Sequence, residues 1–265
     1  MIDRTVMRTV LALAAVLFCA TPAALADAPL PALAQGGRLP YTAVLVWHDV
    51  VRDRKDVWFD TTLDTLRTQF DAIRRGRFHV VTLAALRAHL ERAAPLPARP
   101  LVLTFDDNGS GIYENAFPLL VRYRYPATLF VHTNFVGRTT SKRHNTWEQL
   151  RAMERSGLVD VQSLTANHPE DLRALPDGDV AHELRLSKFS LERRLGRRVY
   201  AFAYPYDNHD ERVARIAHEQ GYALGVTEDW GNAGDSPSLL LLHRYSILTR
   251  FDQALADVAR GRATE

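Results

Sequence analysis

A short apolar run that ends in two adjacent acids constrains the fold of this chain more than any other stretch. Residues 101–105 read Leu-Val-Leu-Thr-Phe, and Asp106 and Asp107 follow at once. A run of branched apolar side chains predicts a strand buried on both faces, as in a parallel sheet. The Asp, Asn and Gly residues that follow favour a turn, so both acids lie where the strand ends. In α/β folds, functional sites are built at this carboxyl end of the strands.

The acid pair has two interpretations. Neighbouring carboxylates repel each other, and a bound cation is the commonest way to keep both ionised when they are buried together. Alternatively, Asp106 and Asp107 begin a turn and are solvated, because aspartate is common at the start of a loop. The rest of the chain has to decide between these interpretations.

Strand-like and helix-like segments alternate from residue 41 onward. The strand-like segments are residues 43–47, 79–82, 101–105, 127–131, 158–162, 199–203, 223–227 and 239–242. The helical segments are residues 63–73, 83–90, 113–123 (with Pro118 as an obstacle), 146–157, 180–195, 211–220 and 251–259. Strands separated by helices predict parallel strands joined by helical crossovers. We expect a closed or nearly closed barrel rather than an open sheet.

The first 26 residues have the pattern of a signal peptide. Arg4 and Arg8 are basic, residues 10–18 are apolar but too short to span a bilayer, and residues 24–26 fit a cleavage site. An uncleaved anchor is the alternative. We expect residues 27–40 to be a poorly ordered leader and residues 41–265 to form the domain. The chain would then be periplasmic or extracellular, with no transmembrane segment after cleavage.

Cysteine content and charge exclude several classes of function. The single cysteine, Cys19, lies in the predicted signal peptide, so the mature chain would have no disulfide, no thiolate chemistry and no cysteine-ligated metal. The formal net charge of +2 argues against nucleic acid as the main partner. We expect a monomer.

Polar residues follow three other predicted strands at the edge that carries the acid pair. They are His48 and Asp49, residues 163–169 and residues 204–207. Because parallel strands end at the same edge of a sheet, these loops are expected to lie near Asp106 and Asp107.

Together these segments resemble the polysaccharide deacetylase family, also called NodB-homology domains or carbohydrate esterase family 4. Residues 104–109 are similar to its first motif, Thr-Phe-Asp-Asp-Gly, and residues 202–206 to its third. Residues 47–50 and 243–244 resemble the branch that includes the poly-N-acetylglucosamine deacetylases. The resemblance covers residues 42–247 and implies a distorted (β/α)7 TIM-like barrel.

The resemblance also implies a reaction, the hydrolysis of an N-acetyl or O-acetyl group on an amino-sugar polymer. By motif position Asp106 would be the general base, and Asp107 would be a ligand of a divalent metal, with zinc the first choice. Such a metal polarises the acetyl carbonyl and lowers the pKa of a bound water. A backbone N–H near Tyr206 would share the charge of the oxyanion, and His243 is a candidate general acid.

Five residues near the expected site are candidates for binding the substrate, an acetylated amino-sugar polysaccharide or oligosaccharide. They are Trp47, His48, Tyr204, Tyr206 and Asp207. Tyr204 and Tyr206 would offer ring faces to a sugar, and the alternative is that they are core aromatics. Structural roles stay open for His48, as a buried histidine bonded to backbone, and for His243, as a histidine at a strand end.

The second family motif departs from its pattern. In the family, two histidines four residues apart bind one metal; here His168 matches the second, and Leu164 occupies the place of the first. Leucine cannot bind a cation, and two protein ligands are too few for a catalytic zinc site, which uses three. His132, just past the 127–131 strand, is the first candidate for the missing ligand, with Asn108 and Asp207 behind it. The alternative for His132 is a polar residue that closes its strand.

Three functions compete at this point. The first is an exported metal-dependent polysaccharide deacetylase. The second is a catalytically silent carbohydrate-binding relative, which Leu164 favours. The third is hydrolysis of a different amide or ester bond, because one barrel can host several chemistries.

Overall fold

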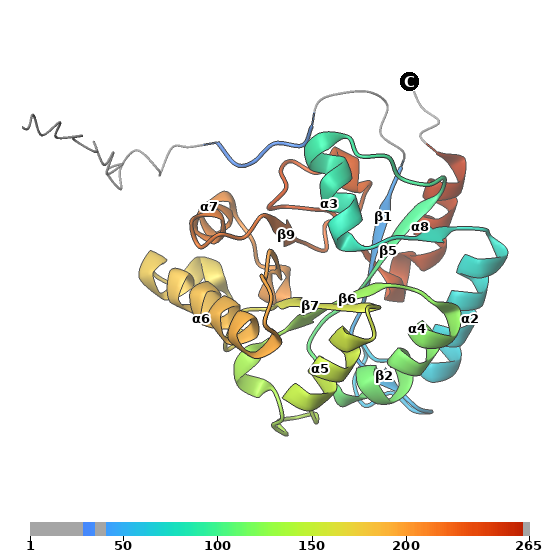
Figure 1. The fold of residues 1–265 in the computed structure, drawn as a ribbon, viewed down its shortest axis with the longest axis horizontal. Helices are drawn as coiled ribbons and strands as arrows, with labels where there is room; N and C mark the ends of the chain where they lie inside the picture. The colour runs from blue at the N-terminus through green and yellow to red at the C-terminus, as the bar shows by residue number, and fades with distance from the viewer. Residues whose placement is uncertain (1–28, 35–40, 262–265) are drawn as a thin grey trace, which may run out of the picture.

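A curved, fully parallel sheet forms the centre of the molecule in the computed structural model, which describes residues 29–34 and 41–261. The sheet runs in the order β10–β1–β5–β6–β7–β8–β9, and β4 pairs with β5. Figure 1 labels β1, β5, β6, β7 and β9 of this sheet. Its strands are β1 (Ala43–Trp47), β4 (His79–Val80), β5 (Pro100–Phe105), β6 (Ala127–Val131), β7 (Val159–Ser163), β8 (Ala201–Ala203), β9 (Leu224–Val226) and β10 (Tyr245–Ser246). A second, two-stranded sheet pairs β2 (Val50–Val51) with β3 (Thr61–Thr62).

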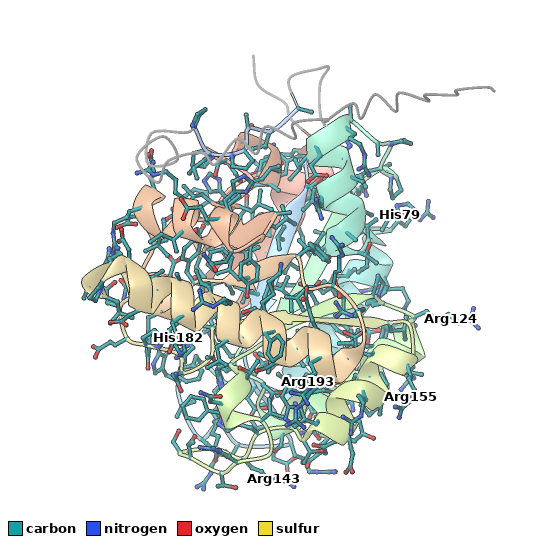
Figure 2. All side chains as sticks on the ribbon, turned by 60° about the vertical axis from the view of Figure 1, so that its left-hand side comes forward. His79, Arg124, Arg143, Arg155, His182 and Arg193 are labelled. Carbon is teal, nitrogen blue, oxygen red and sulfur yellow. The ribbon has the colours of Figure 1, made fainter. Side chains whose placement is uncertain are left out.

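Helices cover the outside of the main sheet (Figure 1). They are α2 (Leu63–Arg75), α3 (Leu83–Arg92), α4 (Phe117–Tyr123), α5 (Trp147–Arg155), α6 (Asp177–Leu195), α7 (Glu211–Glu219) and α8 (Ile247–Arg260). Exposed side chains such as Arg124, Arg155 and Arg193 extend outward from this layer, as Figure 2 shows. The predicted alternation of parallel strands with helical crossovers is confirmed.

The region around Pro118 shows how the chain accommodates a proline within a helical pattern. A π-helical turn, Ile112–Ala116, comes first, and α4 begins at Phe117 with Pro118 in its first turn. Proline is tolerated there because the first N–H groups of a helix have no intrahelical partner. The predicted 113–123 helix is therefore two consecutive pieces.

The predicted strand at residues 239–242 is wrong. This leucine-rich run is buried, but its backbone turns: Leu241 N donates to Ser238 O at 3.1 Å and Leu240 N to Ser238 Oγ at 3.1 Å. The run contacts β9 at its two ends: Gly225 N donates to Leu239 O at 3.0 Å, and Leu242 forms a parallel bridge with Val226. Since β10 pairs with β1, that bridge brings the two ends of the sheet close to closure.

Part of the predicted leader lies against the barrel. Leu239 N donates to Pro31 O at 2.9 Å, and Ala34 N donates to Leu90 O at 2.5 Å. Residues 29–34 therefore pack on the domain, whereas the predicted signal peptide, residues 1–26, lies outside the described residues. No helix in the described part of the chain is long and apolar enough to cross a membrane.

Gly111, just after β5, lies where two backbone segments come too close together to leave room for a side chain. A Cβ at Gly111 would lie 2.1 Å from Val50 O, and a backbone oxygen cannot move aside cheaply. We expect Gly111→Ala to lower the free energy of unfolding by about 1–3 kcal/mol, measured by urea denaturation. The matched control is Gly178→Ala in α6, where a Cβ meets nothing within 4 Å. That change should be neutral or stabilising by up to about 1 kcal/mol, and equal losses in both variants would contradict the explanation.

Candidate active site

The loops that follow the strands meet at the carboxyl end of the sheet and line one cavity of about 760 Å³. Most of the predicted site residues line it: His48, Asp106, Asp107, His132, His168, Tyr204, Tyr206 and Asp207. Trp47, His243 and the reserve ligand candidate Asn108 do not. Leu164 also lines the cavity. The strand-end argument from the sequence therefore located the cavity.

Backbone strain concentrates around this cavity. Of the ten non-glycine residues with positive φ in the described chain, six lie in the site loops: Asp107, Asn108, Thr165, His168, Tyr206 and Asp207. Such conformations persist only where the surroundings fix them, and they cluster at functional sites. Asn145 donates to the Asn108 side chain at 3.1 Å, and His168 N donates to Thr165 Oγ1 at 3.1 Å.

Asp106 is held by a buried ion pair. Arg244 donates to its two carboxylate oxygens at 2.9 and 2.8 Å, and the Arg244 side chain is 1% exposed. Burial alone would lower the pKa of Arg244, but the Asp106 charge beside it raises that pKa overall. The bidentate geometry fixes the orientation of the carboxylate and offsets the cost of burying it.

Asp107 faces His168 rather than Arg244. His168 Nε2 lies 3.6 Å from Asp107 Oδ1, and burial lowers the pKa of His168 despite the nearby acids. His132 is next to this pair, with its ring centroid 5.3 Å from that of His168. Burial, with the neighbouring histidines, lowers the pKa of His132 to about 3, so its imidazole is neutral at ordinary pH.

The register of the sheet relates His132 to the residue that replaces the expected ligand. Val131 pairs with Ser163, and Leu164 N donates to Val131 O at 2.9 Å. The next positions along the two strands are His132 and Leu164, which both line the cavity. The metal ligand that Leu164 cannot supply is therefore available from His132, its neighbour on the adjacent strand.

The residues Asp107, His168 and His132 fit a divalent cation by the chemistry of their donors. Neutral imidazole and carboxylate are ordinary zinc ligands, and Zn–N bonds of about 2.0–2.1 Å in a tetrahedral site put imidazole centroids roughly 5 Å apart. The His132 Nδ1 atom is buried and has no hydrogen-bond partner among the described residues, so turning this ring breaks no bond at that atom. This freedom to rotate matters because, in the described structure, the donor atoms of Asp107, His168 and His132 do not all lie within 4.8 Å of one another.

One set of three donors in the described chain lies within 4.8 Å of one another: His48, Asp106 and Glu228. A cation is disfavoured there because the Arg244 guanidinium already occupies both oxygens of Asp106. His48 Nε2 is 3.9 Å from Glu228 Oε1, and burial raises the pKa of Glu228. This arrangement suits proton transfer better than metal binding.

Two predicted site residues are corrected by their positions. Trp47 is fully buried, donates to Gln69 Oε1 at 2.8 Å and stacks on Phe105, so it is a core residue and cannot contact a sugar. His243 lies outside the cavity, and its backbone N–H donates to Ser236 Oγ at 2.9 Å. Its role as a general acid is therefore unsupported.

The two predicted tyrosines differ in exposure. Tyr204 is 3% exposed, and its hydroxyl donates to Leu240 O at 2.8 Å, so the core alternative applies to it. Tyr206 is 65% exposed, and its ring centroid lies 4.8 Å from that of His168. Of these two tyrosines, Tyr206 is the one that offers an open aromatic surface beside the predicted metal ligands.

Asp207 fixes the loop after β8 through a charged contact. It accepts from Glu228 N at 2.6 Å, and His209 bridges it to Asp229, with Nδ1 3.4 Å from Asp207 and Nε2 3.1 Å from Asp229. The hydrogen bond to Asp207 is the largest cause that raises the pKa of His209 to about 9.

This shift predicts a pH dependence of stability. Because the folded pKa of His209 is above the ordinary value of 6.5, its contribution is fully present below about pH 6.5 and is lost as pH rises through 9. Thermal melting should show wild type more stable than His209→Gln at pH 6, with the difference shrinking towards pH 10. A difference that grows with pH would contradict this assignment.

Several cavity residues were missed from the sequence. His144 lines the cavity with its Nδ1 3.2 Å from Asp107 O and its Nε2 3.0 Å from Thr140 Oγ1, but it lies in a polar loop with no motif. Glu228 could have been found, because it comes just after the predicted 223–227 strand. Trp58, Phe59 and Lys142 also line the cavity and carry no sequence signal of their own.

Comparison with known proteins identifies a matching family. Residues 93–225 match the family described as polysaccharide deacetylase. The chain is 28% identical over 182 residues to the poly-beta-1,6-N-acetyl-D-glucosamine N-deacetylase of Staphylococcus epidermidis, covering 64% of this chain and 61% of that protein. It is 29% identical over 147 residues to the Escherichia coli K12 protein of the same name, covering 51% of this chain and 22% of that protein.

Among solved structures, the chain is similar to IcaB from Ammonifex degensii. The two share 26% identity with a TM-score of 0.75, over 84% of this chain and 98% of that chain. The predicted NodB-type α/β barrel is thereby confirmed. The matches cover 61% and 22% of the two relatives from Staphylococcus epidermidis and Escherichia coli K12, so this chain corresponds to only part of each of those proteins.

Proposed function

Because this chain belongs to the polysaccharide deacetylase family, we propose that it is a metal-dependent hydrolase that removes acetyl groups from an amino-sugar polymer. The observation that carries the proposal is the division of the acid pair: Asp106 is paired with Arg244, and Asp107 faces His168 in the same cavity. Two adjacent carboxylates with such different partners suit two different tasks, one as base and one as ligand.

Asp107, His168 and His132 would hold the divalent ion, with zinc as the first choice. When bound, such an ion polarises the acetyl carbonyl and lowers the pKa of a bound water. Asp107 and His168 are in contact distance, and His132 takes the place that Leu164 leaves empty across the strand pair. His144 would orient this group through its contact with Asp107 O.

Asp106 would take the proton from the attacking water. Arg244 keeps the carboxylate oriented for this step, because it binds both oxygens from a fully buried position. His48, with Glu228 beside it, is the better candidate to protonate the leaving nitrogen, and it replaces His243 in that role. A backbone N–H near Tyr206 would stabilise the oxyanion.

The substrate that we propose is an N-acetylated glucosamine polymer, since the curated relatives above carry that activity in their names. We further propose export, based on the signal-peptide pattern of residues 1–26. The alternative, a catalytically inactive carbohydrate-binding protein, is supported by Leu164 alone. The Asp106–Arg244 pair is evidence against it, because a binding module does not need an oriented base.

The proposal is tested by incubating the zinc-supplied protein with N-acetylated β-1,6-glucosamine oligomers and, separately, with O-acetylated sugars. Free amines should appear on the first substrate together with acetate. Acetate release from the O-acetylated sugars alone would show that the chain hydrolyses O-acetyl groups rather than N-acetyl groups. No acetate release from either substrate would overturn the proposed function.

A further inference from the structure

An exposed tryptophan lies at the rim of the cavity. Trp58 lines the cavity from the loop between β2 and β3, and 78% of the residue is exposed. Its ring packs edge-on against Phe59 at a centroid distance of 5.4 Å, and the Phe59 ring lies 5.2 Å from that of His48. An aromatic series therefore runs from solvent to the residue that we assign as proton donor.

The turn that carries Trp58 is braced from inside. Asp60 is fully buried, and its Oδ2 accepts from Asp56 N at 2.9 Å and from Val57 N at 3.1 Å. Asp60 N also donates to Val57 O at 3.2 Å. A surface presented by a fixed turn loses little conformational entropy when a ligand binds, which favours affinity.

Lys142 fastens this turn to the opposite loop. Its ammonium forms ion pairs with Asp60 and with Asp49 (3.1 Å to Asp49), and its side chain is 15% exposed. Lys142 comes from the same loop as His144, which lines the cavity near Asp107. One partly buried cation thus ties the Trp58 turn to the loop that carries His144.

Trp58 and Tyr206 lie on loops from different sides of the barrel mouth. The Trp58 loop follows β1 and the Tyr206 loop follows β8, and three strands, β5, β6 and β7, separate these two in the sheet. A sugar whose acetyl group reaches Asp106 would leave its neighbours in the chain to contact these aromatic surfaces.

We propose that Trp58 is a specificity-determining residue that binds a sugar next to the reacting one and so selects oligomers, and that Lys142 positions it. The proposal rests on the proposed function, since it takes a glycan chain as the substrate. Aromatic faces with a polar edge suit sugar rings, which alternate apolar C–H surfaces with hydroxyls.

The test compares a pentamer of N-acetylglucosamine with a small aryl acetate. In Trp58→Ala, kcat/KM should fall about tenfold more for the pentamer than for the ester, mainly through KM. Trp230→Ala is the matched control, because Trp230 is 52% exposed but stacks under Arg250 and does not line the cavity; it should change neither value. Equal losses on both substrates in Trp58→Ala would overturn the proposal.

Lys142 is tested by a pair of variants. Lys142→Met should raise KM for the pentamer, and Lys142→Arg, which keeps a cation between Asp49 and Asp60, should restore it; no difference between the two would overturn the positioning role. If wild type hydrolyses neither substrate, the proposed function fails, and calorimetric binding of the pentamer decides the inference separately. Weaker binding by Trp58→Ala supports it, and equal binding overturns it.

Discussion

Asp106→Asn lowers kcat for acetyl release by about 10²–10⁴-fold, the range expected for loss of a general base. Asparagine matches the shape of aspartate and still accepts a hydrogen bond from Arg244, but it cannot take a proton from water. Acetate release under saturating substrate measures the effect. A variant that keeps the wild-type kcat would show that Asp106 is not the base.

The same substitution has a predictable cost in stability, which has to be separated from the kinetic effect. Arg244 is 1% exposed and would lose its counter-charge, so we expect the free energy of unfolding to fall by about 3–5 kcal/mol. Glu154→Gln is a suitable control, because it breaks the ion pair with Arg197, whose guanidinium also contacts Val161 O, outside the cavity. That variant should lose stability and keep kcat.

His168→Ala and His132→Ala each weaken zinc binding by more than the roughly 10–100-fold that loss of an outer-shell partner costs. Burial lowers the pKa of both imidazoles, which favours the neutral form that binds zinc, and removal of either leaves two protein donors. Competition with a chromophoric chelator measures the affinity directly, without reference to activity. Zinc binding by His132→Ala that equals wild type would exclude His132 as the third ligand.

Two further variants make this experiment specific. The zinc affinity of His144→Ala should be only about 10–100-fold lower than that of wild type. Both nitrogens of His144 already have hydrogen-bond partners, Asp107 O and Thr140 Oγ1, so neither is a free metal ligand. Leu164→His restores the donor that the family places there, and it should rescue zinc binding in the His132→Ala background. If zinc binding is not rescued, a side chain at position 164 does not reach the metal site.

The strand pattern and the position of the acid pair were predictable because both depend on local sequence. Residues 101–105 form a strand buried along its whole length, and Asp106 and Asp107 lie at its end. Glu228 follows β9 in the same way, and the rule that identified the acid pair applies equally to it.

The errors come from features that depend on tertiary contacts. In β1 every residue is buried, so the sequence has no alternation to show that Trp47 points into the core while the next residue, His48, lines the cavity. Residues 239–242 are apolar enough for a strand, but their backbone bonds to Ser238 in a turn. His144 and Lys142 line the cavity because their loop bonds to the residues after β5, where Gly109 and His144 form an antiparallel bridge.

The most direct test of the account is a zinc titration of acetate release by the metal-free wild-type chain, with N-acetylated glucosamine oligomers as substrate. We predict negligible release without metal and full activity at about one zinc per chain, as for a single catalytic site. Acetate release at the same rate with and without zinc, or none at any zinc concentration, would contradict it.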